Sequence, residues 1–309
     1  MKIVTLTLSP AFDIHCATPS LIIGREHAAT ILHRDVGGKG INVSRALKSC
    51  GTEVLTFVVL GQENEKEFLD SLVREGISAR KISTSGRIRE NITVRTEDGT
   101  ETRISFSNDA VSPDLLLQVK ETIAPVLSRD DVLCLAGSIP KGIPTDPLKE
   151  WLLMLRQDGI RTVIDSRSFS SEDLISCRPW LIKPNGEEIA SYAGTRVETP
   201  EDAIYAAREF FERGIDNVMV SLGKKGAVLM CAEGRFYAQP PKIQAKSTIG
   251  AGDSAIAGFL SMTANGSNIA DCLRRAVAFG SAACLSEGTT PPQPDDVEAI
   301  YPLVTLESL

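Results

Sequence analysis

The 309-residue sequence has no long hydrophobic run and no strongly basic stretch. Its longest apolar segments, such as Thr56–Leu60, are far shorter than the ~20 residues that a membrane-spanning helix needs. Its 33 basic side chains are outnumbered by 40 acidic ones, which gives a formal net charge of −7. Proteins that bind nucleic acid usually carry a basic patch, and none is evident here. We therefore expect neither a membrane protein nor a nucleic-acid-binding protein.

Histidines are few and the cysteines form no paired motif. The three histidines, His15, His27 and His33, all lie near the N-terminus, and their scarcity argues against a zinc site or a histidine-based triad. The seven cysteines are odd in number and include no C-x-x-C motif, which is typical of reduced thiols in a cytoplasmic protein. The segment Met1–Thr5 enters a strand pattern directly, so we expect no secretory signal and a cytoplasmic location.

Short apolar segments alternate with helical patterns along most of the chain. Short apolar strands separated by helices are typical of an α/β fold with a parallel sheet covered on both faces, here as one domain over residues 1–309. The expected strands are Lys2–Leu8, Glu53–Leu60, Asp131–Ala136, Arg161–Asp165, Trp180–Lys183 and Asn217–Ser221. The expected helices are Ile41–Ser49, Asn64–Glu75, Asp114–Leu127, Leu148–Asp158, Glu201–Arg213, Asp253–Ala264 and Ile269–Ser286.

Two stretches, at about residues 13–36 and 87–107, alternate polar and apolar residues without helical spacing. The second contains a β-hairpin signal, because Asn91–Arg95 and Thr102–Phe106 flank the turn Glu97–Thr100. Alternation indicates strands with one covered and one open face. We predict that both stretches form a small sheet, inserted in the main domain and shaped like a lid.

A glycine-rich turn, Gly37–Asn42, precedes the first predicted helix. Ligands of open α/β sheets bind at the carboxyl ends of strands, where such turns let the backbone approach closely. The helix start favours anions and Lys39 adds a positive charge. The string is not a nucleotide-binding P-loop, because Gly40 replaces the Ser or Thr that would follow the lysine. An ordinary turn explains this string equally well.

A second glycine-rich turn, Ser247–Ser254, has free amide groups at a predicted helix start. These amides could form an anion pocket that Asp253 also faces. The alternative is that Asp253 is a simple helix N-cap. The turn superficially matches a dinucleotide fingerprint, but two consecutive helices follow it without an intervening strand. This excludes a nicotinamide-dependent oxidoreductase.

The segment Lys183–Glu188 follows a predicted strand and places a carbonyl, an amide and a carboxylate on the first turn of a helix. Such a set suits a hydrated Mg²⁺ ion, although Glu188 alone fits an ordinary partner of the helix dipole. The turn Ser221–Gly226 could likewise contact a nucleotide or simply join a hairpin.

Four strings taken in order resemble the ribokinase-like carbohydrate kinases, and within them the phosphofructokinase B group. They are Leu8–Asp13, Gly37–Asn42, Lys183–Glu188 and Thr248–Asp253, and the resemblance covers essentially the whole chain. It implies a three-layer αβα sandwich with a small β-sheet lid. It also implies transfer of the γ-phosphoryl group of ATP, with Mg²⁺, to a sugar hydroxyl.

The resemblance implies a role for each matching residue. Asp253 corresponds to the catalytic base, and Gly250, Ala251 and Gly252 to the anion hole. The implied sugar-site residues are Asp13, Gly38, Lys39, Asn42, Arg89, Arg103 and Ser138. The implied ATP contacts are Lys183, Asn185, Ser221, Gly223, Gly226, Thr248, Gly280 and Ser281. Glu188 would lie in the Mg²⁺ region, and a K⁺ site would involve Ser247, Ile249, Ala283 and Gly288.

The implied acceptor is a phosphosugar whose phosphate is held by Lys39, Arg89 and Arg103, although Arg103 fits an exposed hairpin arginine as well. Fructose 1-phosphate is the expected substrate, with tagatose 6-phosphate and fructose 6-phosphate as alternatives. The pair Asn108-Asp109 replaces a glycine common in related sequences and brings negative charge near this pocket.

Two further functions stay open: a kinase for a nucleoside or an unphosphorylated sugar, and an inactive sugar-binding module. We expect no DNA-binding appendage, and this argues against a regulatory module. The alternating lid leaves an apolar face that it cannot cover by itself. Together with the resemblance, this predicts a homodimer joined through the lid.

Overall fold

The structure is a computed structural model that describes residues 1–107 and 110–309. The predicted departure at Asn108-Asp109 lies outside the described residues.

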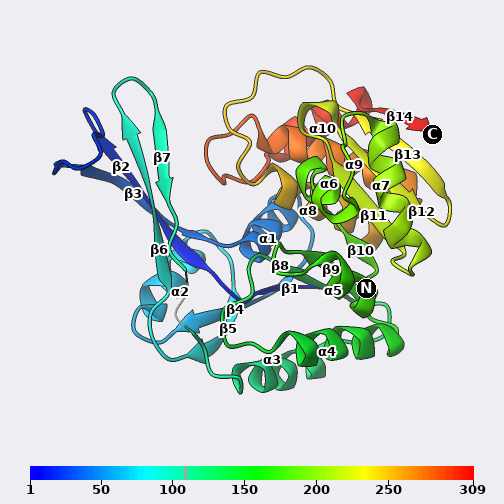
Figure 1. The fold of residues 1–309 in the computed structure, drawn as a ribbon, viewed down its shortest axis with the longest axis horizontal. Coiled ribbons are helices and arrows are strands. Elements are labelled where there is room, and N and C mark those ends of the chain that lie inside the picture. Colours follow the sequence, from blue (N-terminus) through cyan, green and yellow to red (C-terminus); the bar gives the residue numbers. More distant parts are fainter. Residues whose placement is uncertain (108–109) are drawn as a thin grey trace.

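A ten-stranded sheet runs through the described part of the molecule, in the order β14-β13-β12-β11-β10-β9-β8-β1-β4-β5 (Figure 1). Its strands are β1 (Ile3–Thr7), β4 (Leu55–Gly61), β5 (Ala79–Thr84), β8 (Val132–Ala136), β9 (Arg161–Asp165), β10 (Leu181–Ile182), β11 (Asn217–Ser221), β12 (Ala227–Cys231), β13 (Gly234–Gln239) and β14 (Thr305–Ser308). All pairs from β5 to β11 are parallel, as predicted.

The edge formed by β12, β13 and β14 is antiparallel and extends the predicted parallel sheet by strands that were not predicted. The cause is the tight turn between β11 and β12. Only an antiparallel pair can be joined so briefly, because a parallel pair needs a long crossover. Gly226 in this turn has a φ of 96°, and a Cβ there would lie 2.0 Å from the Ala238 carbonyl oxygen.

Helices cover both faces of the sheet and complete the predicted three-layer fold (Figure 1). One face packs against α3 (Leu115–Ile123), α4 (Thr145–Gln157), α5 (Ser171–Cys177), α6 (Gly186–Ala193) and α7 (Pro200–Glu212). The other packs against α1 (Lys39–Ser49), α8 (Ala251–Ala264), α9 (Ile269–Ala283) and α10 (Pro294–Ile300). Successive residues of one strand serve opposite cores: Leu133 faces the first and Cys134 the second.

A second sheet in the order β3-β2-β6-β7 projects away from the body of the molecule (Figure 1). It contains β2 (Ala11–Thr18), β3 (Thr30–Gly37), β6 (Arg89–Thr96) and β7 (Glu101–Ile104), and we refer to it as the lid sheet. Residues 19–29, which the sequence placed in this sheet, form no strand. At its base Phe12 packs edge-on against Phe68 of α2 (Glu65–Arg74), with the ring centroids 5.2 Å apart.

The lid sheet has two chemically different faces. Asp13 lies opposite Asp35 on β3 and Asn91 on β6, so one face is polar. Ile14, Ile92 and Ile104 are aligned across neighbouring strands on the other, apolar face. No helix among the described residues is long and apolar enough to cross a membrane, and all seven cysteines are unpaired thiols.

Candidate active site

Asp253 lies in the first turn of α8, at the carboxyl edge of the central sheet. Its side chain is only 6% exposed, and the Asn42 side-chain amide of α1 donates to Asp253 Oδ2 over 2.8 Å. The helix N-cap is Gly250, with a φ of 78°, and no side chain caps this helix. The N-cap alternative for Asp253 is therefore wrong. Gly250 provides a left-handed turn that most side chains resist, and this turn aims Asp253 inward.

Burial raises the pKa of Asp253 to about 6, and the negative charge of Asp165 acts in the same direction. The hydrogen bond from Asn42 and the charges of Lys39 and Lys183 oppose this shift. A carboxylate with a pKa near 6 is ionised at neutral pH and still basic enough to accept a proton from a reacting hydroxyl.

Asp165 joins the site as a residue that the sequence did not single out. It ends β9, its side chain is buried, and it lies between two lysines. Lys39 Nζ is 3.1 Å from Asp165 Oδ1, and Lys183 Nζ is 3.6 Å from Oδ2. Burial opposes the charge on Asp165, but Lys183 and Lys39 outweigh it and hold its pKa below the usual value. The sequence did contain a feature that could have identified Asp165: it is an acidic residue at the carboxyl end of a buried strand.

The same Asp165 keeps Lys39 protonated. Burial disfavours the ammonium, yet Asp165 and then Asp253 raise the pKa of Lys39 above its usual value. Lys39 is the first residue of α1 and lies close to Gly137. If residue 137 had a Cβ atom, that atom would be 3.8 Å from the Cβ of Lys39. Ser138, an implied sugar contact, follows Gly137 and is exposed.

The start of α8 presents unbonded backbone amides. The Ala251 amide donates weakly to the Thr248 carbonyl over 3.4 Å, whereas the amides of Gly252 and Asp253 have no backbone acceptor among the described residues. A Cβ at Gly252 would lie only 3.0 Å from Lys183 Nζ. Glycine at this position therefore lets a lysine and two free amides approach one point, which is the arrangement an anion requires.

Arg45 orients Asn42 and is a further residue missed from sequence. Its Nη1 donates to Asn42 Oδ1 over 2.9 Å, its Nη2 to the Val36 carbonyl over 2.6 Å, and its Nε pairs with Glu75 at 2.6 Å. Because Arg45 occupies the carbonyl end of the Asn42 amide, the NH₂ end must point at Asp253. Arg45 is 8% exposed, so the contacts that hold Asn42 are shielded from water.

Two of the implied phosphate-binding cations gather on the polar face of the lid sheet. Arg103 Nη2 lies 2.7 Å from Asp13 Oδ1, and Asn91 donates to the same oxygen over 2.9 Å. Arg89 Nη1 donates to the Phe106 carbonyl over 2.9 Å, and its Nε has no hydrogen-bond partner among the described residues. Arg103 is an exposed residue of the β6–β7 hairpin that is paired with Asp13. The third implied cation, Lys39, is paired with Asp165.

Glycines at the base of the lid sheet allow this arrangement. A Cβ at Gly37 would fall 2.4 Å from Asp13 Oδ2, so a side chain there would displace the carboxylate. Gly38 has a φ of 148°, and a Cβ on it would lie 2.7 Å from Thr7 Cγ2. These close contacts explain why both residues before Lys39 are glycine.

Glu188 and Asn185 form a capping box at the start of α6. The Glu188 amide donates to Asn185 Oδ1 over 2.8 Å, and the Asn185 amide donates to Glu188 Oε2 over 2.9 Å. Arg167 Nε contacts Glu188 Oε1 at 2.5 Å, but its side chain is 73% exposed. Glu188 therefore has the ordinary role at a helix start that the sequence also allowed. The other carboxylate oxygen, Oε1, is held only by this exposed arginine and could accept a hydrated cation instead.

The remaining implied nucleotide residues fall into two groups. Ser221, Gly223 and Gly226 lie at the turn between β11 and β12, and the Ser221 amide donates to the Pro184 carbonyl beside Lys183. This turn does join a hairpin. On α9, Ser281 Oγ donates to the Val277 carbonyl over 2.7 Å, so its hydroxyl bonds within the helix. A Cβ at Gly280 would lie 3.2 Å from the Ala251 carbonyl oxygen, so Gly280 permits close packing of α9 on α8.

The implied K⁺ residues lie on two adjacent segments. The amides of Lys246 and Ser247 both donate to the Cys284 carbonyl, over 2.8 and 3.4 Å, and this brings the loop before α8 to the end of α9. Ile249 and Thr248 follow on the first segment, and Ala283 and Gly288 lie on the second. Gly288 has a φ of 58°.

A family model described as "pfkB family carbohydrate kinase" matches residues 11–296, which include the lid sheet and both glycine-rich turns. The chain belongs to the PfkB family of carbohydrate kinases. It is therefore a phosphotransferase that acts on a sugar hydroxyl, and the family implies ATP and a divalent metal ion.

The relatives of this PfkB kinase that have names are phosphofructokinases. It is 33% identical over 260 residues to 1-phosphofructokinase of Escherichia coli K12, covering 84% of this chain and 83% of the relative. It is 29% identical over 304 residues to the ATP-dependent 6-phosphofructokinase isozyme 2 of the same organism, covering 97% and 98%. The crystal structure of E. coli phosphofructokinase-2 in complex with potassium superimposes with a TM-score of 0.90 at 29% identity, covering 98% of each chain.

Proposed function

We propose that this PfkB kinase transfers the γ-phosphoryl group of ATP to fructose 1-phosphate and forms fructose 1,6-bisphosphate. The observation that carries the proposal is the buried Asp253 carboxylate beside two free amides and two lysines. The names of relatives at 30–33% identity favour fructose 1-phosphate. Because ATP is the donor, we expect the enzyme to work in the cytoplasm.

Each group at the site has a defined task in this proposal. Asp253 accepts the proton of the attacking hydroxyl, and Asn42 holds its carboxylate in place. The Gly252 and Asp253 amides stabilise the charge on the transferred phosphoryl group, and Lys183 neutralises the nearby phosphates. Lys39 approaches the same point from α1. Phosphoryl transfer requires mainly positioning and charge neutralisation, and this arrangement supplies both.

We assign the divalent ion to Mg²⁺, near Glu188. Mg²⁺ prefers oxygen ligands and keeps several of its waters, so one carboxylate at the edge of the phosphate site is enough to hold it. Asp165 Oδ2, which has no hydrogen-bond partner among the described residues, is a second carboxylate oxygen in this region. When bound, the ion would neutralise phosphate charge. The segments around Ser247 and Ala283 are our candidate for K⁺, and a relative crystallised with potassium supports this.

The acceptor phosphate is assigned to Arg89 and Arg103 on the lid sheet. In this structure Asp13 neutralises Arg103, and we expect a sugar hydroxyl to take over Asp13 while the phosphate takes over the arginines. A dianion needs at least two cations, and the two guanidinium groups come from neighbouring strands. Fructose 6-phosphate is a second candidate acceptor, because one relative, 29% identical over 304 residues, is named ATP-dependent 6-phosphofructokinase isozyme 2.

We also propose that the lid sheet, with residues 13–36 and 87–107, forms the homodimer contact of a single-domain kinase. Its polar face carries the sugar residues, whereas Ile104 on its apolar face is 47% exposed and Ile31 is 65% exposed. Apolar surface of this kind favours association with a second copy. A related structure is described as a tetrameric form.

A coupled assay of ADP release tests the substrate assignment. The purified enzyme is compared with fructose 1-phosphate, fructose 6-phosphate and tagatose 6-phosphate as acceptors, each with ATP and Mg²⁺. We expect the highest kcat/KM with fructose 1-phosphate. A higher kcat/KM with either other sugar phosphate would refute the acceptor and leave the kinase class intact, whereas activity only on unphosphorylated sugars would refute a phosphate-binding lid.

A further inference from the structure

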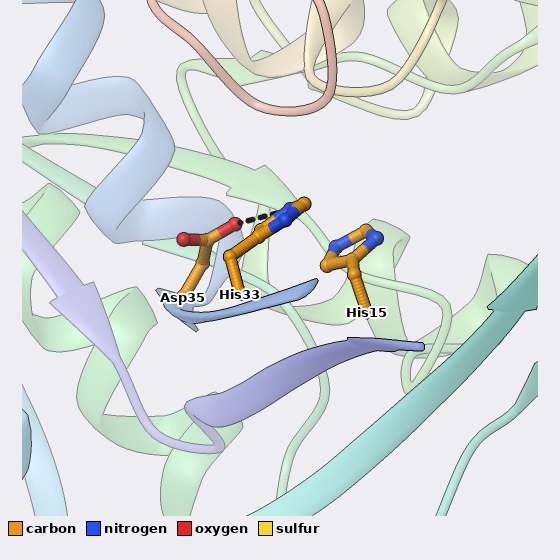
Figure 2. A group of neighbouring side chains, drawn as sticks. All are labelled: His15, His33 and Asp35. Atoms are coloured by element: carbon orange, nitrogen blue, oxygen red, sulfur yellow. Dashed lines mark ion pairs between the residues drawn. The ribbon is translucent and has the colours of Figure 1, made fainter. Parts of the chain in front are cut away.

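Two histidines and an aspartate gather on the polar face of the lid sheet (Figure 2). His15 comes from β2, and His33 and Asp35 come from β3. Each side chain can offer one ligand atom, and these atoms all lie within 4.8 Å of one another. None of the three has a role in the proposed phosphoryl transfer. The scarcity of histidine argued against a metal site, but the fold brings two of the three histidines into contact.

Strand register explains the cluster. β2 and β3 are antiparallel, with His15 directly opposite His33 and Asp13 directly opposite Asp35. Side chains two apart on a strand share a face, so Asp35 lies on the same side as His33. The imidazole rings stack with centroids 4.3 Å apart and an interplanar angle of 14°. His33 Nε2 also lies 3.3 Å from Asp35 Oδ2 (Figure 2).

We propose that His15, His33 and Asp35 bind a first-row transition-metal dication, such as Zn²⁺, with a fourth position left for water. Imidazole nitrogen suits these metals, whereas Mg²⁺ takes oxygen ligands, so the site is distinct from the Mg²⁺ site at the nucleotide. With metal–ligand bonds of about 2.0–2.1 Å, the ligand atoms of a tetrahedral site are about 3.3 Å apart. The His33–Asp35 separation already has this value.

Binding requires a small rearrangement of the rings. A metal lies in the plane of an imidazole, so two stacked rings cannot both ligate it until one rotates. The χ2 angle of histidine is soft, and the His33 and Asp35 side chains are 53% and 50% exposed, so little packing resists this movement. The nearby cation Arg103 is paired with Asp13, which lowers its repulsion of a bound dication.

Metal titration of the full-length enzyme tests the site directly. Zn²⁺ is titrated in competition with a chromophoric chelator, and Co²⁺ binding is followed by its visible absorption, with Mg²⁺ present throughout. The variants are His15→Ala and His33→Ala, and His27→Ala is the matched control, because His27 lies outside the cluster and contacts Ile22. We expect one equivalent bound, an affinity lower by at least about 10–100-fold in the two cluster variants, and no change in the control.

Two results would overturn the proposal: no Zn²⁺ or Co²⁺ binding by the wild-type enzyme, or equal binding by wild type and both cluster variants. Equal binding would show that the metal is held by residues other than these two histidines. The milder variant His33→Asn, checked by circular dichroism, separates loss of a ligand from loss of fold. All these readouts are independent of kinase activity, so failure of the proposed function would leave them unaffected.

Discussion

Replacement of Asp253 by asparagine should remove activity and make the protein more stable. Asparagine preserves the size of the side chain, and its carbonyl can still accept the bond from Asn42, whose orientation is fixed by Arg45. It cannot accept a proton, so we expect kcat to fall by about 10²–10⁴-fold. The KM for ATP should change little. Turnover within tenfold of wild type would refute the role of Asp253 as the base.

The stability change follows from the raised pKa of Asp253. Its pKa is about 6 in the folded protein against an ordinary value of 3.8, and at 1.36 kcal/mol for each pKa step this difference amounts to about 3 kcal/mol. A raised pKa gives stability that is present below about pH 4 and is lost as the pH rises through about 6. Asparagine does not ionise, so the variant does not lose stability in this way as the pH rises. At pH 7.5 the Asp253→Asn variant should therefore have the higher Tm.

Thermal unfolding of both proteins at pH 5 and pH 7.5 checks this reasoning. The difference in Tm between variant and wild type should be larger at pH 7.5, by several degrees at most for a chain of this size. Comparison of the two proteins at each pH removes the contribution of the other carboxylates. A Tm advantage that shrinks as the pH rises would contradict the burial of an ionised carboxylate at this position.

Four further outcomes are expected. Arg89→Ala should raise the KM for the sugar phosphate at least about tenfold and leave the KM for ATP nearly unchanged. The control is Arg87→Ala, because Arg87 is exposed. Equal changes in both KM values would contradict phosphate binding by Arg89. Glu188→Gln should raise the Mg²⁺ concentration needed for half-maximal rate and keep the Tm, because glutamine also serves in a capping box; a collapse of the Tm would reduce Glu188 to a structural residue. Arg45→Lys should move the acidic limb of the kcat profile to higher pH, because the Asn42 bond that lowers the pKa of Asp253 loosens; an unshifted limb would separate Arg45 from the base. Light scattering should give about twice the chain mass of 33.3 kDa for wild type and a lower mass for Ile104→Asp, and a wild-type mass near one chain would refute the lid dimer.

Many of the strands and helices were predictable, because the apolar residues that mark them in the sequence are also the residues that pack in the core. The strands Arg161–Asp165 and Asn217–Ser221 were predicted with the boundaries that the structure shows. Their central apolar residues are adjacent and face helices on opposite sides of the sheet, as Val163 and Ile164 do, so these strands show no alternation of polar and apolar residues. The antiparallel edge was not predicted, because β12 and β13 follow a turn that the sequence left open between a hairpin and a nucleotide contact.

The glycine-rich turns, the acid after the second of them and the resemblance to a kinase family were all recognisable from the order of the amino acids. Each of those signals is local, because a left-handed glycine or a free helix start is fixed by a few neighbouring residues. Which groups meet depends on the folded chain: Asp165 lies between two lysines, Arg45 contacts Asn42, and His15 stacks on His33. Those pairs lie 126, 18, 3 and 18 positions apart along the chain. Even Arg45 and Asn42, which share a helix, needed β3 and Glu75 to fix the guanidinium. Contacts between distant segments depend on strand order and register, which no short sequence pattern encodes.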